Sequence, residues 1–107
     1  AIAVMDAGIR RIVEQVQADE FYRDNTLFVI APDCGRDDSR FAAVPCQHHF
    51  NTGAAREVFA LFFGAGVDQG RIFDRPTQQI QVASTIGAAM GIKTAHAEGE
   101  VLSEVFA

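Results

Sequence analysis

The sequence is poor in cysteine, in long apolar runs and in clustered basic residues. Its 107 residues include two cysteines, three prolines and no tryptophan. The two cysteines, Cys34 and Cys46, are too few to define a disulfide framework. No apolar run approaches the roughly 20 residues that a membrane-spanning helix needs. The net charge is −5, and no basic stripe is available for phosphate contacts, so neither a membrane span nor a nucleic-acid partner is expected.

What the sequence does contain is typical of one globular domain. Hydrophobic residues make up 49% and charged residues 21% of the chain. From Asp6 to about Phe21, apolar residues recur at three- and four-residue steps, which predicts an amphipathic helix. A second helix is predicted over 78–90, with Thr77 as its N-cap and Gly91 as its end. The expected core-facing residues are Ile9, Ile12, Val13 and Val16 in the first helix, and Ile80, Ala83, Ile86, Gly87 and Met90 in the second.

Two continuous apolar runs predict strands, over 27–31 and 57–63. Runs without alternation are typical of strands covered on both faces, as in a parallel sheet with helices on each side. The order of elements therefore indicates an α/β layer structure. Because two strands alone would leave bare edges, we expect this chain to be part of a larger sheet, completed by further residues or by another chain.

A loop over 32–55 separates the predicted strands, and it carries the candidate site. Asp33 follows the first strand directly, at the kind of sheet edge where ligands bind. Its carboxylate and an imidazole from His48 or His49, returning in the loop, would suit zinc, manganese or iron, and the Cys34 thiolate would favour zinc. Adjacent residues point to opposite sides, so Asp33 and Cys34 would serve two metals of one pair.

Each of these residues also has a simpler interpretation. Asp-x-Gly is common turn chemistry at a strand end. A His-His pair in a loop is usually solvated, and a single cysteine such as Cys34 is more often a small buried apolar residue. Arg36 and Asp37 are most simply interpreted as a solvated charge pair. Spacing alone favours these interpretations over a metal site.

A family resemblance changes this balance. The segment DNTLFVIAPDCGRD (24–37) resembles the strand and metal-binding turn of the alkaline phosphatase superfamily, whose usual motif there is Asp-His-Gly. The similarity continues through EVFALFFGAGV (57–67), QQIQVASTIGAAMGI (78–92) and GEVLSEVF (99–106), which look like the elements that follow in that family. The resemblance covers nearly the whole chain in the right order, although no single motif is highly specific.

The resemblance implies a fold and a set of roles. The fold would be a fragment of a three-layer α/β/α sandwich, with two buried strands flanked by helices. Asp33 would be a metal ligand, and His49, or alternatively His48, the later metal histidine. Cys34 departs from the family by standing at the position of the dyad's histidine. The metal would be zinc or manganese, with two ions in the intact parent.

The implied activity is hydrolysis of phosphate or sulfate esters. In this superfamily the nucleophile and the first metal carboxylates precede the dyad, and nothing before Asp33 matches them. Residues 1–107 are therefore expected to be the C-terminal part of a larger hydrolase domain, without catalytic residues of their own. The alternative is a non-catalytic or degenerate domain that assembles, for example into a homo-oligomer, through exposed sheet edges. A free-standing ligand-binding domain is a weaker third interpretation, because no Gly-rich phosphate loop is present.

Overall fold

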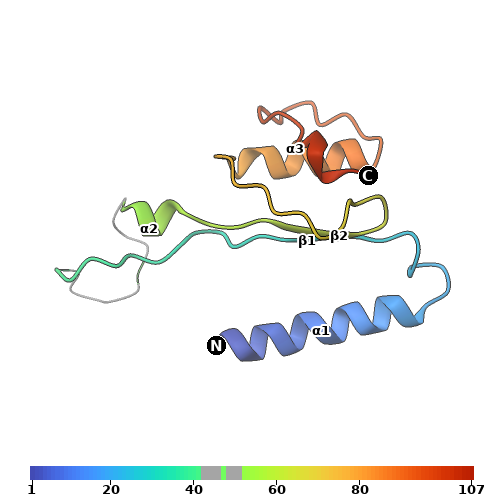
Figure 1. The fold of residues 1–107 in the computed structure, drawn as a ribbon, viewed down its shortest axis with the longest axis horizontal. Helices are drawn as coiled ribbons and strands as arrows, with labels where there is room; N and C mark the ends of the chain where they lie inside the picture. The colour runs from blue at the N-terminus through green and yellow to red at the C-terminus, as the bar shows by residue number, and fades with distance from the viewer. Residues whose placement is uncertain (42–46, 48–51) are drawn as a thin grey trace. The chain divides into compact units, whose positions relative to one another are not determined.

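The computed structural model describes residues 1–41, 47 and 52–107 (Figure 1). These residues divide into two compact units, one made of 1–28 with 62–107 and the other of 29–61. The elements are, in chain order, α1 (Ile2–Ala18), β1 (Leu27–Ile30), α2 (Gly53–Arg56), β2 (Leu61–Gly64), α3 (Ile80–Ala89) and the 3-10 helix η1 (Ser103–Val105). The mixed α/β class predicted from the sequence is confirmed.

β1 and β2 pair with each other, and the pairing is antiparallel rather than parallel. The Ala65 N–H donates to the Thr26 carbonyl, while on the other side of β1 the Gly35 N–H donates to the Ala55 carbonyl (both 2.9 Å). From Thr26 to Gly35 the residue number rises, while the number of the bonded residue falls from Ala65 to Ala55. This order defines an antiparallel pair. The prediction of a parallel arrangement was therefore wrong, because an apolar run without alternation does not fix the direction of the neighbouring strand.

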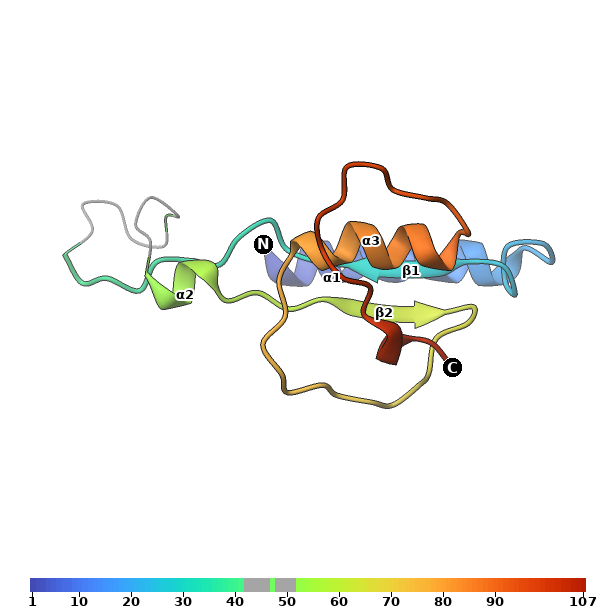
Figure 2. The same ribbon diagram turned by 90° about the horizontal axis from the view of Figure 1, so that it is seen from above.

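The strands are shorter and less buried than predicted. Every residue of β1 is half-buried, and β2 begins with an exposed Leu61 followed by three half-buried residues. In the first unit the strands run between α1 on one side and α3 on the other (Figures 1 and 2). The predicted flanking by helices is thus present. Between the two strands, the rings of Phe28 and Phe63 stack with their centroids 4.7 Å apart. The strands are not fully buried because the two-stranded ribbon has an open edge on each side.

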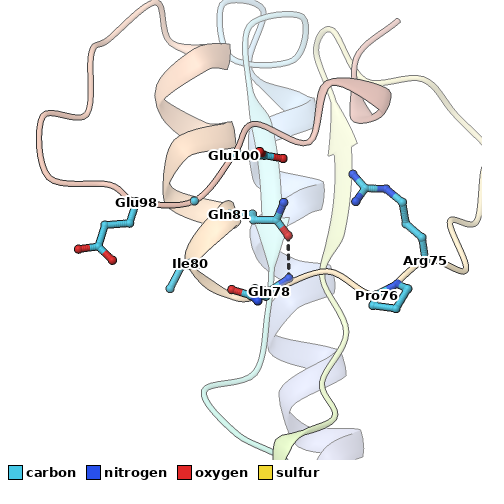
Figure 3. Close-up of a pocket in the computed structure, with 8 residues that line it drawn as sticks. Arg75, Pro76, Gln78, Ile80, Gln81, Glu98 and Glu100 are labelled. Carbon is cyan, nitrogen blue, oxygen red and sulfur yellow. Dashed lines mark hydrogen bonds between the residues drawn. The ribbon is translucent and has the colours of Figure 1, made fainter.

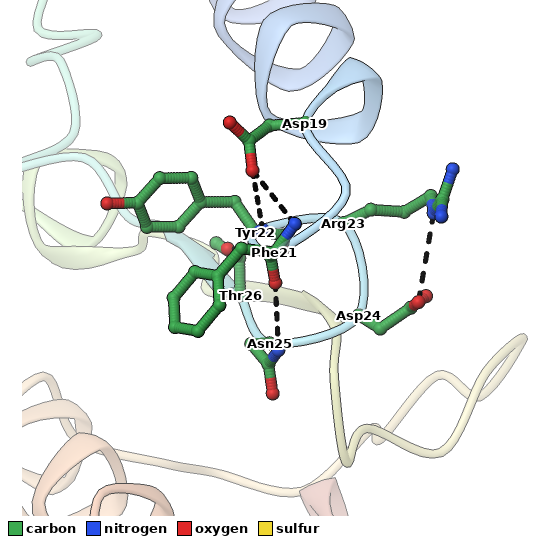
Figure 4. A network of polar contacts seen from close by, with 7 residues as sticks. All are labelled: Asp19, Phe21, Tyr22, Arg23, Asp24, Asn25 and Thr26. Atoms are coloured by element: carbon green, nitrogen blue, oxygen red, sulfur yellow. Dashed lines mark hydrogen bonds and ion pairs between the residues drawn. The ribbon is translucent and has the colours of Figure 1, made fainter.

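The turn between α1 and β1 is built from local polar contacts (Figure 4). The Asp19 carboxylate accepts the N–H groups of Phe21 and Tyr22, and the Thr26 hydroxyl donates to the Tyr22 carbonyl at 2.7 Å. The Asn25 amide donates to the Phe21 carbonyl. These side chains bond to N–H and carbonyl groups of Phe21 and Tyr22, within the turn itself, so local contacts hold the reversal of the chain into β1.

α1 lies close to its predicted range and α3 matches it, but their buried faces differ in detail. In α1, Ile9, Val13 and Val16 are half-buried, whereas Ile12 is 61% exposed. In α3 the predicted apolar side is largely wrong, since Ile80 and Met90 are exposed. Of the predicted side, Gly87 is buried, and the other buried residues of the helix are Ser84 and Thr85, which were not predicted.

Small residues are needed on this face of α3 because the C-terminal segment packs closely against it. A Cβ on Gly87 would lie 2.6 Å from the Thr94 methyl group. The Thr85 hydroxyl, fully buried, donates to the Gln81 carbonyl (2.7 Å) and accepts the Leu102 N–H (3.0 Å). Leu102 then packs with Val67 and Val105 in the hydrophobic cluster of the first unit. Thr77 does not cap the helix; Gln79 occupies the N-cap position.

We expect Thr85→Val to lower the free energy of unfolding by about 1–3 kcal/mol, because the Leu102 N–H is left buried without an acceptor. Ser84→Ala is the matched control on the same helix. The Ser84 hydroxyl is buried and has no hydrogen-bond partner among the described residues, so removing it is expected to be neutral or stabilising. Urea unfolding of both variants measures the difference. Equal losses would contradict the role given to Thr85.

Candidate functional site

Asp33 and Cys34 lie directly beyond β1, in the second unit. The Cys34 backbone N–H donates to Asp33 Oδ1 at 2.9 Å, and the Cys34 thiol donates to the same oxygen at 3.5 Å. Asp33 is exposed and Cys34 is half-buried. Both side chains therefore meet at one carboxylate oxygen, rather than diverging to two sides as the sequence predicted.

This arrangement affects the two groups in opposite ways. The Cys34 N–H, and after it the thiol, stabilise the charged carboxylate and hold the pKa of Asp33 below its ordinary value. Burial, and after it the hydrogen bond to Asp33 and the negative charge of that carboxylate, raise the pKa of the Cys34 thiol. At neutral pH the pair is consequently a carboxylate beside a protonated thiol.

Gly35 explains how this turn is held in place. Its N–H donates to the Ala55 carbonyl, and a Cβ at this position would collide with the Ala54 carbonyl oxygen. Its φ is not positive, so the glycine is required here for the close backbone approach rather than for a left-handed conformation. The partner segment is the short helix α2, which the sequence did not predict and which Thr52 caps by accepting the Ala55 N–H.

Asp37 contradicts the interpretation of Arg36 and Asp37 as a solvated pair. Its side chain is 4% exposed, and it forms no ion pair with any described residue. Asp37 Oδ1 accepts the Ser39 N–H at 2.8 Å, whereas Oδ2 is buried without a hydrogen-bond partner in the described part of the chain. A buried carboxylate was not foreseeable from the charged run Arg36-Asp37-Asp38, because spacing alone does not separate inward from outward positions in a loop.

The other predicted ligands cannot be placed. His48 and His49, like Cys46, lie outside the described residues. Within 1–41, 47 and 52–107, no group of three or more His, Cys, Asp or Glu side chains is arranged to hold a metal ion. Of the predicted ligand set, the structure therefore brings together Asp33 and Cys34, and the convergence of a histidine on them stays a prediction.

A separate cavity of about 310 Å³ lies in the first unit, beside the start of α3 (Figure 3). Its lining includes no hydroxyl, thiol or imidazole side chain, and no metal-binding group is found among the described residues. Arg75 forms an ion pair with Glu104, and the Gln81 side chain accepts the Gln78 N–H at 2.7 Å, so these polar groups already serve the fold. The cavity is lined by Arg75, Pro76, Gln78, Ile80, Gln81, Glu98, Gly99 and Glu100.

Among the described residues, no helix combines the length and apolarity needed to cross a membrane. Comparison of the chain with family models, with curated proteins and with solved structures finds no match in any of the three. The family resemblance accordingly depends on the residues themselves.

The shared oxygen of Asp33 gives a test by thiol chemistry. In Asp33→Asn, loss of the carboxylate lowers the pKa of Cys34, so we expect alkylation by iodoacetamide at pH 8 to become about two- to tenfold faster, because only the thiolate reacts. The measurement is the rate as a function of pH, in a Cys46→Ser background so that one thiol reports. Asp38→Asn removes the same charge nearby without touching Cys34 and is expected to leave the profile unchanged. An identical profile in both variants would refute the coupling.

Proposed function

We propose that this chain contributes metal ligands to a metal-dependent hydrolase of phosphate or sulfate esters. The observation that supports it most directly is Asp33, an exposed carboxylate held in its charged form at the carboxyl end of β1. A charged, accessible carboxylate fixed by a backbone N–H is the donor that a divalent cation requires. The finer fold that accompanies this proposal is the α/β/α sandwich of the alkaline phosphatase type, of which α1, the two strands and α3 would form a part.

Within this proposal Asp33 and one of His48 and His49 hold a divalent cation, zinc or manganese. Bound there, the cation would supply Lewis acidity that activates a hydroxyl nucleophile and neutralises charge on the ester oxygens. Asp33 fits this role as it stands. Cys34 fits less well, because its thiol is protonated and must lose its proton before it binds a metal. The site is therefore expected to hold the cation mainly through Asp33 and the histidine.

The test is metal content and ester hydrolysis of the full-length protein. In Asp33→Ala and His49→Ala we expect bound zinc and phosphatase or sulfatase activity to fall by more than about tenfold, since even residues that only orient ligands contribute about 10–100-fold. Cys34→His, which restores the family's motif, is expected to raise metal affinity, and Cys34→Ser is its control. Unchanged metal content and activity in both Asp33→Ala and His49→Ala would end the proposal.

A second candidate function is assembly, which the exposure of the strands favours. Among the described residues the sheet has only two strands, so each of them has an edge without a strand partner. Val58 and Phe59, which precede β2, and Leu61, its first residue, are exposed. Among the described residues only four hydrophobic side chains are buried: Ala55, Val67, Leu102 and Val105. Exposed apolar strand edges pair readily with further strands, from the same protein or from a second copy.

For assembly we expect concentration-dependent association in sedimentation velocity, weakened by Phe59→Lys, because a charge beside the edge opposes strand pairing. Ile72→Lys is the matched control, since Ile72 is 95% exposed and lies well after the end of β2, whereas Phe59 lies just before its start. A monomer at all concentrations, or equal effects of both substitutions, would count against this function.

A further inference from the structure

Arg36 is the cationic side chain closest in the sequence to Asp33 and Cys34, and the proposed function gives it no role. It is exposed, and within the described part of the chain it forms no ion pair, although Asp37 and Asp38 follow it directly. Its guanidinium therefore keeps N–H donors and a positive charge that no described carboxylate neutralises.

Two backbone hydrogen bonds fix the segment on either side of Arg36. The Gly35 N–H donates to the Ala55 carbonyl at 2.9 Å, and the Asp37 N–H donates to the Gln47 carbonyl at 2.7 Å. Burial changes from one residue to the next between these two points, since Arg36 is exposed and Asp37 is buried. In an extended backbone successive side chains point to opposite sides, so Arg36 lies on the side of the segment opposite Asp37.

The same alternation places Cys34 on the side of the guanidinium, because it stands two residues before Arg36. Asp33 joins them there, since its Oδ1 accepts both the N–H and the thiol of Cys34. The electrostatics agree with this placement. The hydrogen bonds from Cys34 are the main cause of the lowered pKa of Asp33, and the charge of Arg36 lowers that pKa further. Burial is the main cause of the raised pKa of Cys34, and the charge of Arg36 acts against it.

We propose that Arg36 binds the anionic group of the substrate: its guanidinium donates to two oxygens of the phosphate or sulfate group of the ester, beside the carboxylate of Asp33. The role in ester hydrolysis rests on the proposed function, whereas the binding of a tetrahedral oxyanion does not. A guanidinium presents its N–H groups as a planar fork that matches two oxygens of such a group. Because Arg36 and Asp33 form no ion pair within the described residues, the guanidinium is not neutralised by the carboxylate beside it.

The first test uses the metal-free, full-length protein, with inorganic phosphate as the probe and inorganic sulfate in a parallel titration. The ¹⁵N and ¹H shifts of the arginine Nε–H groups are followed, and Arg36→Lys and Arg40→Lys identify the two signals by their loss. We expect the Arg36 signal to shift saturably with at least one of the two anions. The signal of Arg40, an exposed arginine of the same loop, should stay in place. No saturable shift of Arg36 with either anion, or an equal shift of both arginines, would overturn the proposal.

The second test is steady-state hydrolysis of an aryl phosphate and an aryl sulfate by the full-length protein loaded with Zn²⁺. In Arg36→Ala we expect KM for the hydrolysed ester to rise about 10–100-fold, because hydrogen bonds to a charged group are lost. Arg36→Lys should recover part of this loss, since lysine keeps the charge without the fork. Arg40→Ala is the matched control and should leave KM unchanged. The same KM in Arg36→Ala and Arg40→Ala would contradict the role given to Arg36.

Zinc content separates this proposal from the proposed function. Arg36→Ala should hold as much Zn²⁺ as the unmutated protein, in contrast to Asp33→Ala, because a guanidinium is not a metal ligand. Loss of Zn²⁺ in Arg36→Ala would show that the residue acts through the metal site, and the proposal would be wrong. If the unmutated protein hydrolyses neither ester the proposed function fails, and the phosphate and sulfate titrations still decide whether Arg36 binds an oxyanion.

Discussion

Two close backbone approaches, one on each side of β1, constrain the rest of the structure. Before the strand, the Thr26 carbonyl accepts the Ala65 N–H; after it, the Gly35 N–H reaches the Ala55 carbonyl. At each approach stands a glycine whose Cβ would strike the opposite backbone, Gly64 against Thr26 and Gly35 against Ala54. Because both approaches depend on a missing side chain, the register of the ribbon and the position of Asp33 beyond β1 have a common cause.

Held in that position, Asp33 and Cys34 cannot be optimised independently. The contacts that lower the pKa of Asp33 are made chiefly by Cys34, and the pKa of the Cys34 thiol is raised by burial and then by Asp33. A divalent cation at Asp33 would have to compete with the thiol for Oδ1 or displace its proton. The resembled family has a histidine at the position of Cys34. Because the pKa of the Cys34 thiol is raised, the cysteine stands beside the Asp33 carboxylate as a neutral group.

The sequence predicted the elements better than it predicted their surroundings. α1, β1, the turn between them and the end of α3 at Gly91 follow from local rules of periodicity, turn chemistry and left-handed glycine, and Gly91 indeed has a φ of +65°. The antiparallel pairing, the small buried face of α3 and the burial of Asp37 depend on contacts between segments far apart in the sequence. An apolar run does not indicate the direction of the strand that pairs with it. A run of charged residues does not indicate which carboxylate is buried.

The proposed metal site and the proposed assembly surface share one physical requirement. Burying a Leu or Phe side chain contributes about 1.5–3 kcal/mol, and residues such as Phe59 and Leu61 forfeit much of that contribution while they are exposed. Additional strands along the ribbon would recover it and would stiffen β1, whose carboxyl end carries Asp33. A ligand is useful to a metal only when its position is fixed. Covering the strand edges would therefore serve the proposed metal binding, so the two proposed functions, assembly and hydrolysis, are compatible.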